Sequence, residues 1–395
     1  MTTRPCWVEI RTQALEHNFR FLAGITAQHA ELLAIVKADA YGHSMPLCAP
    51  AALRAGAHWL GVTSVEEGVA ARAICREARI LVISGAFAGQ GDAVLQHRLT
   101  VVAWEPWQLD ELESAAVAAH AGSAAIPVHL ELDTGMSRQG VALDHLAPLL
   151  ARFEPESPLK LEGMMTHLFA ADEANGVVTR EQLTKLAAAL EQAQAAGIQA
   201  EWLNVGNSAA VLSGQAAAIG RLAKRHGMKT LMRPGLALYG LAPGFNPAFD
   251  EREPAPLAAA RSTLQPVLVW KTRIVGARSI PAGAVVGYNG TFVASDPMRV
   301  ALLAVGYADG LDRKLGNRFS LLVRGQRAPL VGRISMDQAV LDVTNIPNVS
   351  PGDEVVILGS QDAETITAFD HAEACGTIPW EVFTRISARV PRVAV

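Results

Sequence analysis

The stretch LLAIVKADAYGHS, residues 32–44, starts as a run of apolar and β-branched residues and ends in a Tyr-Gly-His turn. A run of this kind, closed by a turn, is typical of a buried strand. The first 240 residues repeat the arrangement, with Ala- and Leu-rich segments of helical spacing between the runs. The predicted strands are LLAIVKA (32–38), HWLGVTS (58–64), RILVISG (79–85), TVVAW (100–104), IPVHLELD (126–133), LKLEGMMTH (159–167), WLNVGN (202–207) and LMRPGLALYG (231–240). Eight such βα units predict an α/β fold with an N-terminal (β/α)8 TIM-type barrel over residues 11–243.

A doubly wound sheet is the alternative for such an alternation. It is disfavoured because no Gly-x-Gly-x-x-Gly motif follows the first predicted strand. Within the helical segments, Ser64-Val-Glu-Glu67 and Thr179-Arg-Glu-Gln182 are predicted capping boxes. Gly197, after TKLAAALEQAQAA, is a predicted C-cap. These signals favour helices between the strands, as a barrel requires.

The pattern changes after residues 242–266, a segment rich in Pro and Ala that predicts a connection between domains. Short strands bounded by Gly, Pro, Asn or Asp follow it. They are predicted in VLVWKTRIVGA (267–277), RVALLAVGYADG (299–310), FSLLVRGQRAPLVG (319–332), QAVLDVT (338–344) and DEVVILG (353–359). One late helix is predicted near 364–375. Residues 244–395 are therefore predicted to form a C-terminal β-rich domain.

The composition fits a soluble globular enzyme. Of 395 residues, 50% are hydrophobic and 18% are charged, and this length favours two domains. The net charge of −4, without Lys- or Arg-rich runs, argues against nucleic acid as a partner. The start, MTTRPCWVEI, lacks the apolar core of a signal peptide, and no long uncharged apolar run predicts a membrane span.

The cysteines point to a reducing compartment. The chain has four of them, Cys6, Cys48, Cys75 and Cys375, which are far apart and form no Cys-x-x-Cys pair. This spacing argues against a disulfide framework and against a zinc-thiolate site. We therefore expect a cytoplasmic protein, with no metal site.

Polar residues cluster where the predicted strands end. In a barrel, the loops at the C-terminal ends of the strands carry the chemistry. The candidates at these ends are Lys37, Tyr41, Asp133, Arg138, His167, Asn207, Ser208 and Arg233. Each alone has an ordinary structural explanation, such as a solvated strand end or a hydrogen-bonded histidine. Their convergence on one face of a barrel favours a functional site.

The loops after the last two barrel strands are the usual phosphate site of this fold. Asn207 and Ser208 open a predicted helix, where backbone N–H groups and the Ser208 hydroxyl suit an anion, although Ser208 equally suits a plain N-cap. Gly235, in RPGL, allows a ligand to approach the backbone closely. Lys37 is suited to Schiff-base formation because an apolar setting lowers the pKa of an amine. A lysine, a phosphate cradle and arginines together suggest pyridoxal 5′-phosphate as the cofactor.

The chain resembles the alanine racemase family from end to end. The matching motifs are VKADAYGH (36–43), LDTGMSRQG (132–140), MTHLFAADE (165–173), NSAA (207–210), RPGLALYG (233–240), VGYNGTF (286–292), VGYADG (305–310), GRISMDQ (332–338) and RVPR (389–392). The resemblance implies a barrel followed by a β domain, to which the N-terminal strand within residues 1–10 also belongs. It implies a pyridoxal-phosphate-dependent enzyme that interconverts L-alanine and D-alanine, supplying or consuming D-alanine for cell-wall peptidoglycan.

The resemblance also implies roles for residues in the barrel. Lys37 would be the Schiff-base lysine and one of two catalytic bases. Arg233 would face the pyridine nitrogen, with His167 behind it, and Arg138 would contact the ring hydroxyl. The implied phosphate contacts are Tyr41, Asn207, Ser208, Gly235, Leu236 and, in the place of a family tyrosine, Trp380. An arginine beside the pyridine nitrogen disfavours its protonation, which should limit side reactions such as transamination.

Racemisation needs a second base on the other face of the carbanion. Tyr288, in VGYNGTF, matches the tyrosine base of the family; without the resemblance it would be assigned as a strand aromatic packed on a sheet. The implied substrate contacts are Arg138, Tyr307, Met336 and Asp337. In the family, the tyrosine and the residues matching Met336 and Asp337 reach the cofactor of the partner subunit. The resemblance therefore implies a head-to-tail homodimer with shared active sites.

Two positions depart from the family pattern. Many members have a carbamylated lysine two residues before the Asp of DTGM, and this chain has Glu131 there. Glu131 and Asp133 point to the same side of a strand, so we expect the Glu131 carboxylate to orient Arg138 without bound carbon dioxide, with a water bridging any gap. The alternative is that Glu131 pairs with another group in the barrel. Trp380, in IPWEVF, replaces the family tyrosine, which predicts a changed pocket mouth and puts substrate preference in doubt.

Three other functions remain open. Glu131 and Trp380 motivate a racemase for serine, lysine or a wider range of amino acids. A fold-related pyridoxal-phosphate amino-acid decarboxylase is a second alternative, although this chain lacks the Gly-Gly-Gly phosphate loop typical of those enzymes. The third is a cofactor carrier protein built on a single barrel. The residues after the barrel, Tyr288 among them, argue against a carrier.

Overall fold

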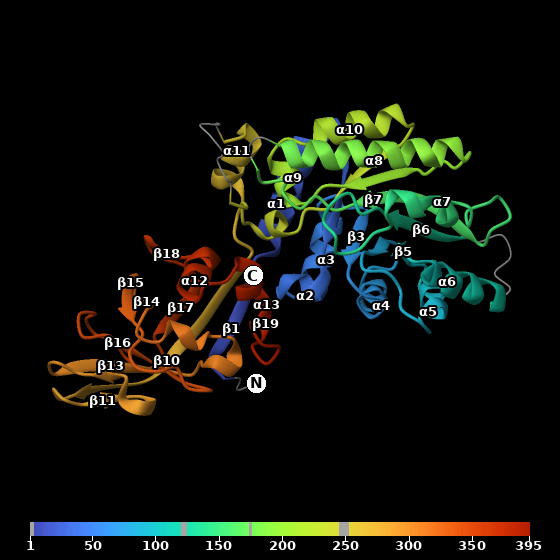
Figure 1. The fold of residues 1–395 in the computed structure, drawn as a ribbon. Coiled ribbons are helices and arrows are strands. Elements are labelled where there is room, and N and C mark those ends of the chain that lie inside the picture. The colour runs from blue at the N-terminus through green and yellow to red at the C-terminus, as the bar shows by residue number, and fades with distance from the viewer. Residues whose placement is uncertain (1–3, 120–124, 174–175, 245–252) are drawn as a thin grey trace. The chain divides into compact units, whose positions relative to one another are not determined.

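The computed structural model describes residues 4–119, 125–173, 176–244 and 253–395. The chain divides into two compact units. The barrel unit comprises Gln13–Ala40 and Met45–Gln265, and the β unit comprises Met1–Thr12, Tyr41–Ser44 and Pro266–Val395. Figure 1 follows the chain from blue to red through both.

Eight parallel strands close a barrel, which confirms the predicted fold class. They are β2 (Glu31–Ile35), β3 (Trp59–Val62), β4 (Arg79–Val82), β5 (Thr100–Ala103), β6 (Ile126–Glu131), β7 (Leu159–Thr166), β8 (Trp202–Val205) and β9 (Lys229–Met232). The predicted strand over 231–240 is too long, because β9 ends at Met232 and a 3₁₀ turn follows at Leu236–Tyr239. Pro234 has no N–H for a ladder, so the strand cannot continue through it.

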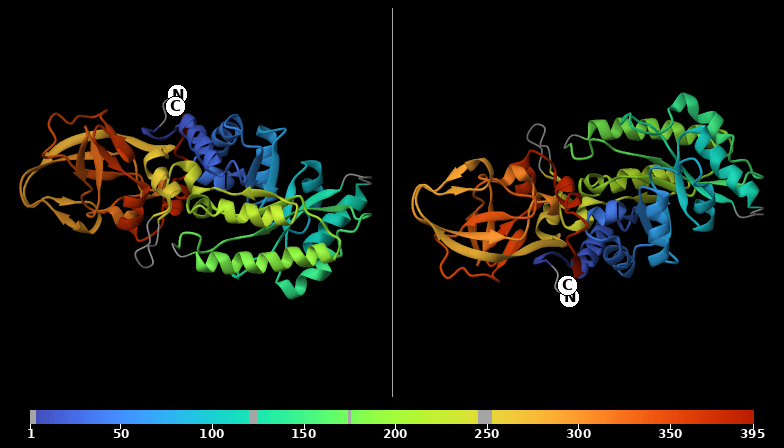
Figure 2. Two further views of the ribbon diagram at one scale, coloured as in Figure 1. Left: turned by 90° about the horizontal axis from the view of Figure 1, so that it is seen from above. Right: turned by 90° about the horizontal axis from the view of Figure 1, so that it is seen from below.

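Helices follow the strands and flank the barrel, as both views of Figure 2 show. They are α1 (Thr12–Thr26), α3 (Met45–Arg54), α4 (Val65–Ile74), α5 (Gly91–Gln96), α6 (Pro106–Ala118), α7 (Leu146–Leu150), α8 (Val177–Ala195), α9 (Ser208–Leu212) and α10 (Ala216–Arg225). The strands are buried on both faces, which is why they are continuous apolar runs in the sequence.

Aromatic residues fill the N-terminal end of the barrel. Trp59 and Trp202 are the first residues of β3 and β8, and their rings meet edge to face at 5.8 Å. His129 packs against Trp59 at 5.9 Å, and the Arg79 guanidinium lies 3.7 Å from the centre of the Trp59 ring. This packed end leaves the C-terminal ends of the strands as the place for polar chemistry.

The helix signals of the sequence are partly right. Ser64 is the N-cap of α4 and accepts from the N–H of Glu67, while the Glu67 carboxylate binds the N–H of Thr63. The predicted cap at Thr179 is wrong, because α8 begins earlier and Thr179 is a buried residue inside it. Gly197 adopts φ 73° just after α8 and its C-cap residue Ala196, as the prediction of a helix end there required.

A nine-stranded sheet forms the β unit, with strand order β15-β14-β17-β10-β1-β19 and further strands at its sides. Its members are β1 (Cys6–Ile10), β10 (Leu268–Ile280), β13 (Met298–Leu303), β14 (Ser320–Val323), β15 (Gln326–Pro329), β16 (Ala339–Asp342), β17 (Glu354–Gln361), β18 (Glu364–Ile366) and β19 (Arg392–Ala394). The N-terminal strand β1 pairs antiparallel with β10 and parallel with the C-terminal strand β19. The two ends of the chain therefore lie side by side in this sheet.

Several short elements differ from the predictions. Part of the predicted connection is a helix, α11 (Ala255–Thr263), which buries only Leu257 and Ala260 and so leaves a weak apolar period; its residues 245–252 lie outside the described residues. The late helix is α12 (Ala368–Cys375), preceded by β18, and a second helix, α13 (Pro379–Thr384), follows it. Among the described residues, none of the helices combines the length and the hydropathy that a membrane span requires.

Candidate active site

Lys37 lies just beyond the C-terminal end of β2, where the backbone turns left-handed. Ala38, Asp39 and Ala40 have φ values of 51°, 50° and 57°. This conformation costs roughly 1–2 kcal/mol for each residue that has a Cβ, and such strain tends to gather at functional sites. The Glu67 carboxylate, at the start of α4, accepts from the N–H of Ala38 at 2.7 Å and helps to hold the turn.

The Lys37 ammonium is in a setting that favours the neutral amine. The side chain is half-buried, and burial is the first reason that the pKa of Lys37 is lowered. The positive charges of Arg138 and Arg233 lower it further, while Glu67 opposes them. A lysine with a lowered pKa is more nucleophilic and a better base near neutral pH.

Arg233 follows β9 and is held by the C-terminal ends of β7 and β8. Its Nη1 donates to the Asn204 backbone oxygen at 2.7 Å and to the Asn204 side-chain oxygen, and its Nη2 donates to the Thr166 oxygen at 2.9 Å. Burial lowers the pKa of Arg233 to about 10, so the guanidinium stays charged at neutral pH.

His167 lies beside this guanidinium, with its Nδ1 3.5 Å from Nη2 of Arg233. Burial and the charge of Arg233 lower the pKa of His167 to about 3. The imidazole is therefore neutral, and Nδ1 is the acceptor because its neighbour can only donate.

Ser208 and the turn after β9 form a second group of polar atoms. The N-cap of α9 is Asn207, whose side-chain oxygen accepts from the N–H of Ala210 at 3.1 Å. The Ser208 hydroxyl is therefore not the cap; it accepts from the N–H groups of Gly235 at 2.9 Å and Ala237 at 3.2 Å. Backbone N–H groups converging on one hydroxyl form a donor set of the kind that binds phosphate oxygens.

The loop after β6 carries Glu131, Arg138 and Gln139. Glu131 is 2% exposed, and its carboxylate accepts a hydrogen bond from the Gln139 amide, which also donates to the Ile83 oxygen at 3.2 Å. Burial raises the pKa of Glu131, while the bond from Gln139 and the charges of Arg233 and Arg138 lower it. Glu131 therefore pairs with Gln139, a group other than Arg138, as the alternative prediction had it. The interaction between Glu131 and Arg138 is one of charge.

Arg138 itself is exposed on this loop, which folds back on β6. The Asp133 carboxylate accepts from the N–H groups of Gly135 at 2.9 Å and Ser137 at 3.0 Å. A Cβ at Gly140 would come within 2.5 Å of the Asp133 nitrogen, so the close return of the loop needs glycine there.

The remaining predicted residues belong to the β unit. Tyr288 lies in a 3₁₀ turn between β11 (Val285–Val286) and β12 (Phe292–Val293) and is 68% exposed, so it is not a strand aromatic packed on a sheet. Tyr307 and Met336 are 43% and 54% exposed, and Asp337 is exposed beside Met336.

The last two predicted phosphate contacts also lie in this unit. Tyr41 is half-buried, with the pKa of its phenol raised to about 12 by burial, and its backbone oxygen bonds His43 at 2.9 Å. Trp380 is half-buried in the first turn of α13.

Sequence reasoning missed four residues that support this site. Glu67 holds the turn at Lys37, and Asn204 holds Arg233. Gln139 binds Glu131, and the Tyr239 hydroxyl donates to the Ile35 oxygen at 2.7 Å, two residues before Lys37. Asn204 and Tyr239 were the detectable ones, since each is a polar side chain within or close to an apolar run. Glu67 and Gln139 lie in segments whose polarity has ordinary explanations.

The donor set fits pyridoxal 5′-phosphate. Arg233 has only donors, so it can meet an unprotonated pyridine nitrogen, and the serine and amide groups suit the phosphate. The barrel and the donor set at its C-terminal edge thus define an enzyme of the pyridoxal-phosphate-dependent class.

Known proteins identify the family within this class. Residues 10–243 match the alanine racemase N-terminal domain and residues 267–394 match the alanine racemase C-terminal domain. The chain belongs to the alanine racemase family, whose members depend on pyridoxal phosphate.

Relatives match over the whole length. An alanine racemase of Nostoc sp. is 36% identical, with 100% of this chain and 96% of the relative covered. The crystal structure of alanine racemase from Streptomyces lavendulae is 33% identical with a TM-score of 0.86, covering 100% of this chain and 98% of that one. The structure from Bartonella henselae, 25% identical with a TM-score of 0.81 and coverage of 99% of both chains, has covalently bound pyridoxal phosphate.

Proposed function

We propose that this protein is an alanine racemase, which interconverts L-alanine and D-alanine with pyridoxal phosphate and so supplies or consumes D-alanine for peptidoglycan. The observation that carries the proposal is Lys37, a lysine with a lowered pKa held by a strained turn at the C-terminal edge of a closed barrel. Full-length relatives that are alanine racemases support the choice of substrate.

In this proposal Lys37 would hold the cofactor through Nζ. Arg233 would donate to the pyridine nitrogen, and Arg138 would donate to the ring hydroxyl. The residues that would hold the phosphate are Tyr41, Asn207, Ser208, Gly235, Leu236 and Trp380. When bound, pyridoxal phosphate delocalises the negative charge that remains on the α-carbon after its proton is removed.

Two side chains move the proton. Neutral Lys37 accepts the α-proton on one face, and Tyr288 serves the opposite face. The lowered pKa of Lys37 increases the neutral fraction of the amine at neutral pH. Arg233, whose pKa of about 10 keeps it charged, cannot donate its proton readily to the pyridine nitrogen, and neutral His167 does not supply one either.

Tyr288 acts on the partner subunit in this proposal, together with Tyr307, Met336 and Asp337. The exposure of Tyr288, Tyr307 and Met336 supports this partner contact, because exposed large apolar side chains are typical of an interface. The enzyme is a head-to-tail homodimer with shared sites, in which 11–243 form the cofactor domain and 1–10 with 244–395 form the β domain. Four buried free thiols agree with a place in the cytoplasm.

Proton NMR in heavy water tests the activity. The protein with added pyridoxal phosphate is incubated with L-alanine, L-serine or L-lysine in separate tubes. We expect loss of the α-proton signal and formation of the D-enantiomer with alanine. Exchange mainly with serine or lysine would assign the departures at Glu131 and Trp380 to a change of substrate. Release of carbon dioxide without a D-amino acid would identify a decarboxylase.

The Glu131 carboxylate supplies the negative charge beside Arg138, so wild-type activity is expected to be independent of bicarbonate. The hydrogen bond from Gln139 and the charges of Arg233 and Arg138 support this role, because all three favour the ionised carboxylate against its burial. Glu131→Gln keeps the size and removes the charge, and it should lower kcat/KM by roughly 10- to 100-fold, the worth of a charged hydrogen bond.

Activity is measured in carbon-dioxide-free buffer with and without bicarbonate. Glu131→Lys is the matched variant, since a lysine can be carbamylated; its activity should be low and should rise with bicarbonate. Stimulation of the wild-type enzyme by bicarbonate would contradict the prediction.

A further inference from the structure

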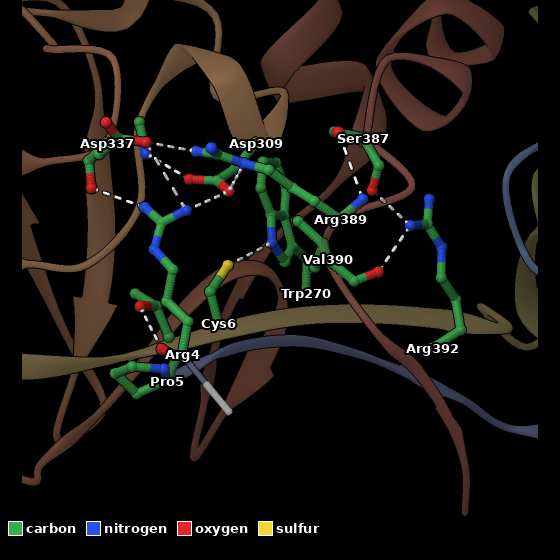
Figure 3. Close-up of polar contacts among 12 residues, drawn as sticks. Arg4, Pro5, Cys6, Trp270, Asp309, Asp337, Ser387, Arg389, Val390 and Arg392 are labelled. Atoms are coloured by element: carbon green, nitrogen blue, oxygen red, sulfur yellow. Dashed lines mark hydrogen bonds and ion pairs between the residues drawn. The ribbon is translucent and has the colours of Figure 1, made fainter. Parts of the chain in front are cut away.

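Four charged residues of the β unit form a charge cluster, Arg4, Asp309, Asp337 and Arg389 (Figure 3). At its centre is Asp309, whose side chain is 1% exposed. Its Oδ1 accepts from Nη1 of Arg4 at 2.7 Å and from Nε of Arg389 at 2.7 Å. A buried carboxylate is stable only when its charge and its lone pairs are satisfied, and two guanidinium groups do so here.

The same two arginines hold Asp337. Nη2 of Arg389 donates to the Asp337 carboxylate at 2.7 Å, and Nη2 of Arg4 donates to its backbone oxygen at 2.7 Å. Each arginine therefore bridges Asp309 and Asp337, as the dashed lines in Figure 3 show. Both carboxylates also raise the pKa of Arg389, so this arginine is charged throughout the working pH range.

Asp309 and Asp337 end two turns that are fastened to each other. The N–H groups of Tyr307 and Ala308 donate to the oxygens of Ser335 and Met336, both at 3.0 Å. The second oxygen of Asp309 accepts from the N–H of Gly306 at 2.8 Å and closes the first turn. A Cβ at Gly306 would lie 2.3 Å from the oxygens of both Ser335 and Met336, so the two turns touch through their backbones.

The arginines come from the two ends of the chain. Arg4 precedes β1 and Arg389 precedes β19, which pair in the sheet, and the N–H of Ser387 donates to the Asp309 oxygen at 3.0 Å. The exposed pair of Arg327 with Glu364, at 2.7 Å, joins one arginine of this unit to one carboxylate. The charge cluster instead joins the chain ends to the turns that present Tyr307 and Met336.

We infer that Arg4 and Arg389 are positioning residues, which fix the turns of Tyr307, Met336 and Asp337 where they enter the partner's active site. This inference rests on the proposed shared-site dimer. The arginines touch no reacting atom; they act through Asp309 and Asp337. A displacement of about 1 Å in the groups that position a substrate can lower the rate by up to roughly 100-fold. The charge cluster therefore matters for substrate binding and turnover.

The first test uses the holoenzymes of Arg4→Gln and Arg389→Gln. We expect KM for alanine to rise by roughly 10-fold or more in each, with the visible absorbance of the bound cofactor unchanged. Arg327→Gln, which breaks an exposed pair of the same unit, is the matched control and should keep the wild-type KM. An unchanged KM in both variants of the charge cluster would overturn the inference.

Hybrid dimers separate positioning from a general effect on folding. A chain with Arg389→Gln is co-expressed with a chain with Lys37→Ala, and the hybrid is isolated through two different tags. One of its sites combines an intact Lys37 with an intact Arg389 from the other chain, so it should show the wild-type KM at about half the turnover number. When both changes are on one chain and the other is wild type, the active site should show the raised KM.

Equal KM values in the two hybrids would overturn the positioning role, because a folding defect does not depend on which chain carries it. A third hybrid, of Lys37→Ala with Tyr288→Phe chains, tests the shared site itself. Its failure to regain activity would instead contradict the proposed dimer and the partner-side part of this inference.

Discussion

Replacing Lys37 by alanine is expected to lower alanine racemisation by roughly 10⁴-fold or more, because one side chain both holds the cofactor and moves the proton. The pKa of Lys37 is lowered by burial and by Arg138, and the variant loses this amine. Racemisation is measured as the formation of D-alanine. Cofactor attachment is measured by the visible absorbance of the protein after gel filtration and by borohydride trapping.

Lys160→Ala is the matched control, since Lys160 is an exposed lysine on β7. It should keep both the activity and the absorbance of the wild type. A Lys37→Ala protein that still retains cofactor after borohydride trapping and still racemises alanine would show that another amine does this work.

Replacing Tyr288 by phenylalanine is expected to lower racemisation by roughly 10²- to 10⁴-fold, the usual contribution of a positioned acid or base. The ring is 68% exposed in a turn of the β unit, so removal of its hydroxyl should leave the unfolding temperature unchanged. The lysine remains, so proton exchange on one face of the α-carbon should persist.

Heavy water distinguishes the two faces. L-alanine and D-alanine are incubated separately with Tyr288→Phe, and the α-proton signals are followed by NMR. One enantiomer should exchange its α-proton without inversion, while the other should exchange much more slowly. If both enantiomers exchange and invert at the wild-type rate, Tyr288 is not the second base and a single-base or carrier function gains support.

The alternation of apolar runs and helical segments determined the barrel, and it did so for a physical reason. Parallel strands buried on both faces must be continuous apolar runs, so β2 and the seven strands after it are visible in the chain. Since the C-terminal ends of such strands lie at one end of the barrel, the sequence alone predicts that Lys37, His167 and Arg233 lie close together. Strand ends were less certain, as at β9, because Pro234 stops a run that is otherwise apolar.

The backbone conformation that follows Lys37 could not be predicted from the sequence. Ala38, Asp39 and Ala40 have no intrinsic preference for positive φ, and the turn is held by a carboxylate from another βα unit, Glu67. The role of Ser208 was equally hidden, since its partners, the N–H groups of Gly235 and Ala237, come from a distant loop. A capping pattern such as that at Thr179 describes only four residues, and tertiary packing can begin the helix elsewhere.

The sequence by itself determined the fold class and the family, because these depend on local periodicity and on long motifs, and the same motifs predict the residues for chemistry. Only the tertiary structure decided which groups touch. It paired Glu131 with Gln139, and it joined Arg4 to Asp309 across 305 positions of the chain. The first pair is made by a loop that folds back on β6, and the second by a chain end that meets a turn of the same unit. These partners are therefore fixed by the tertiary fold, and no spacing in the sequence records them.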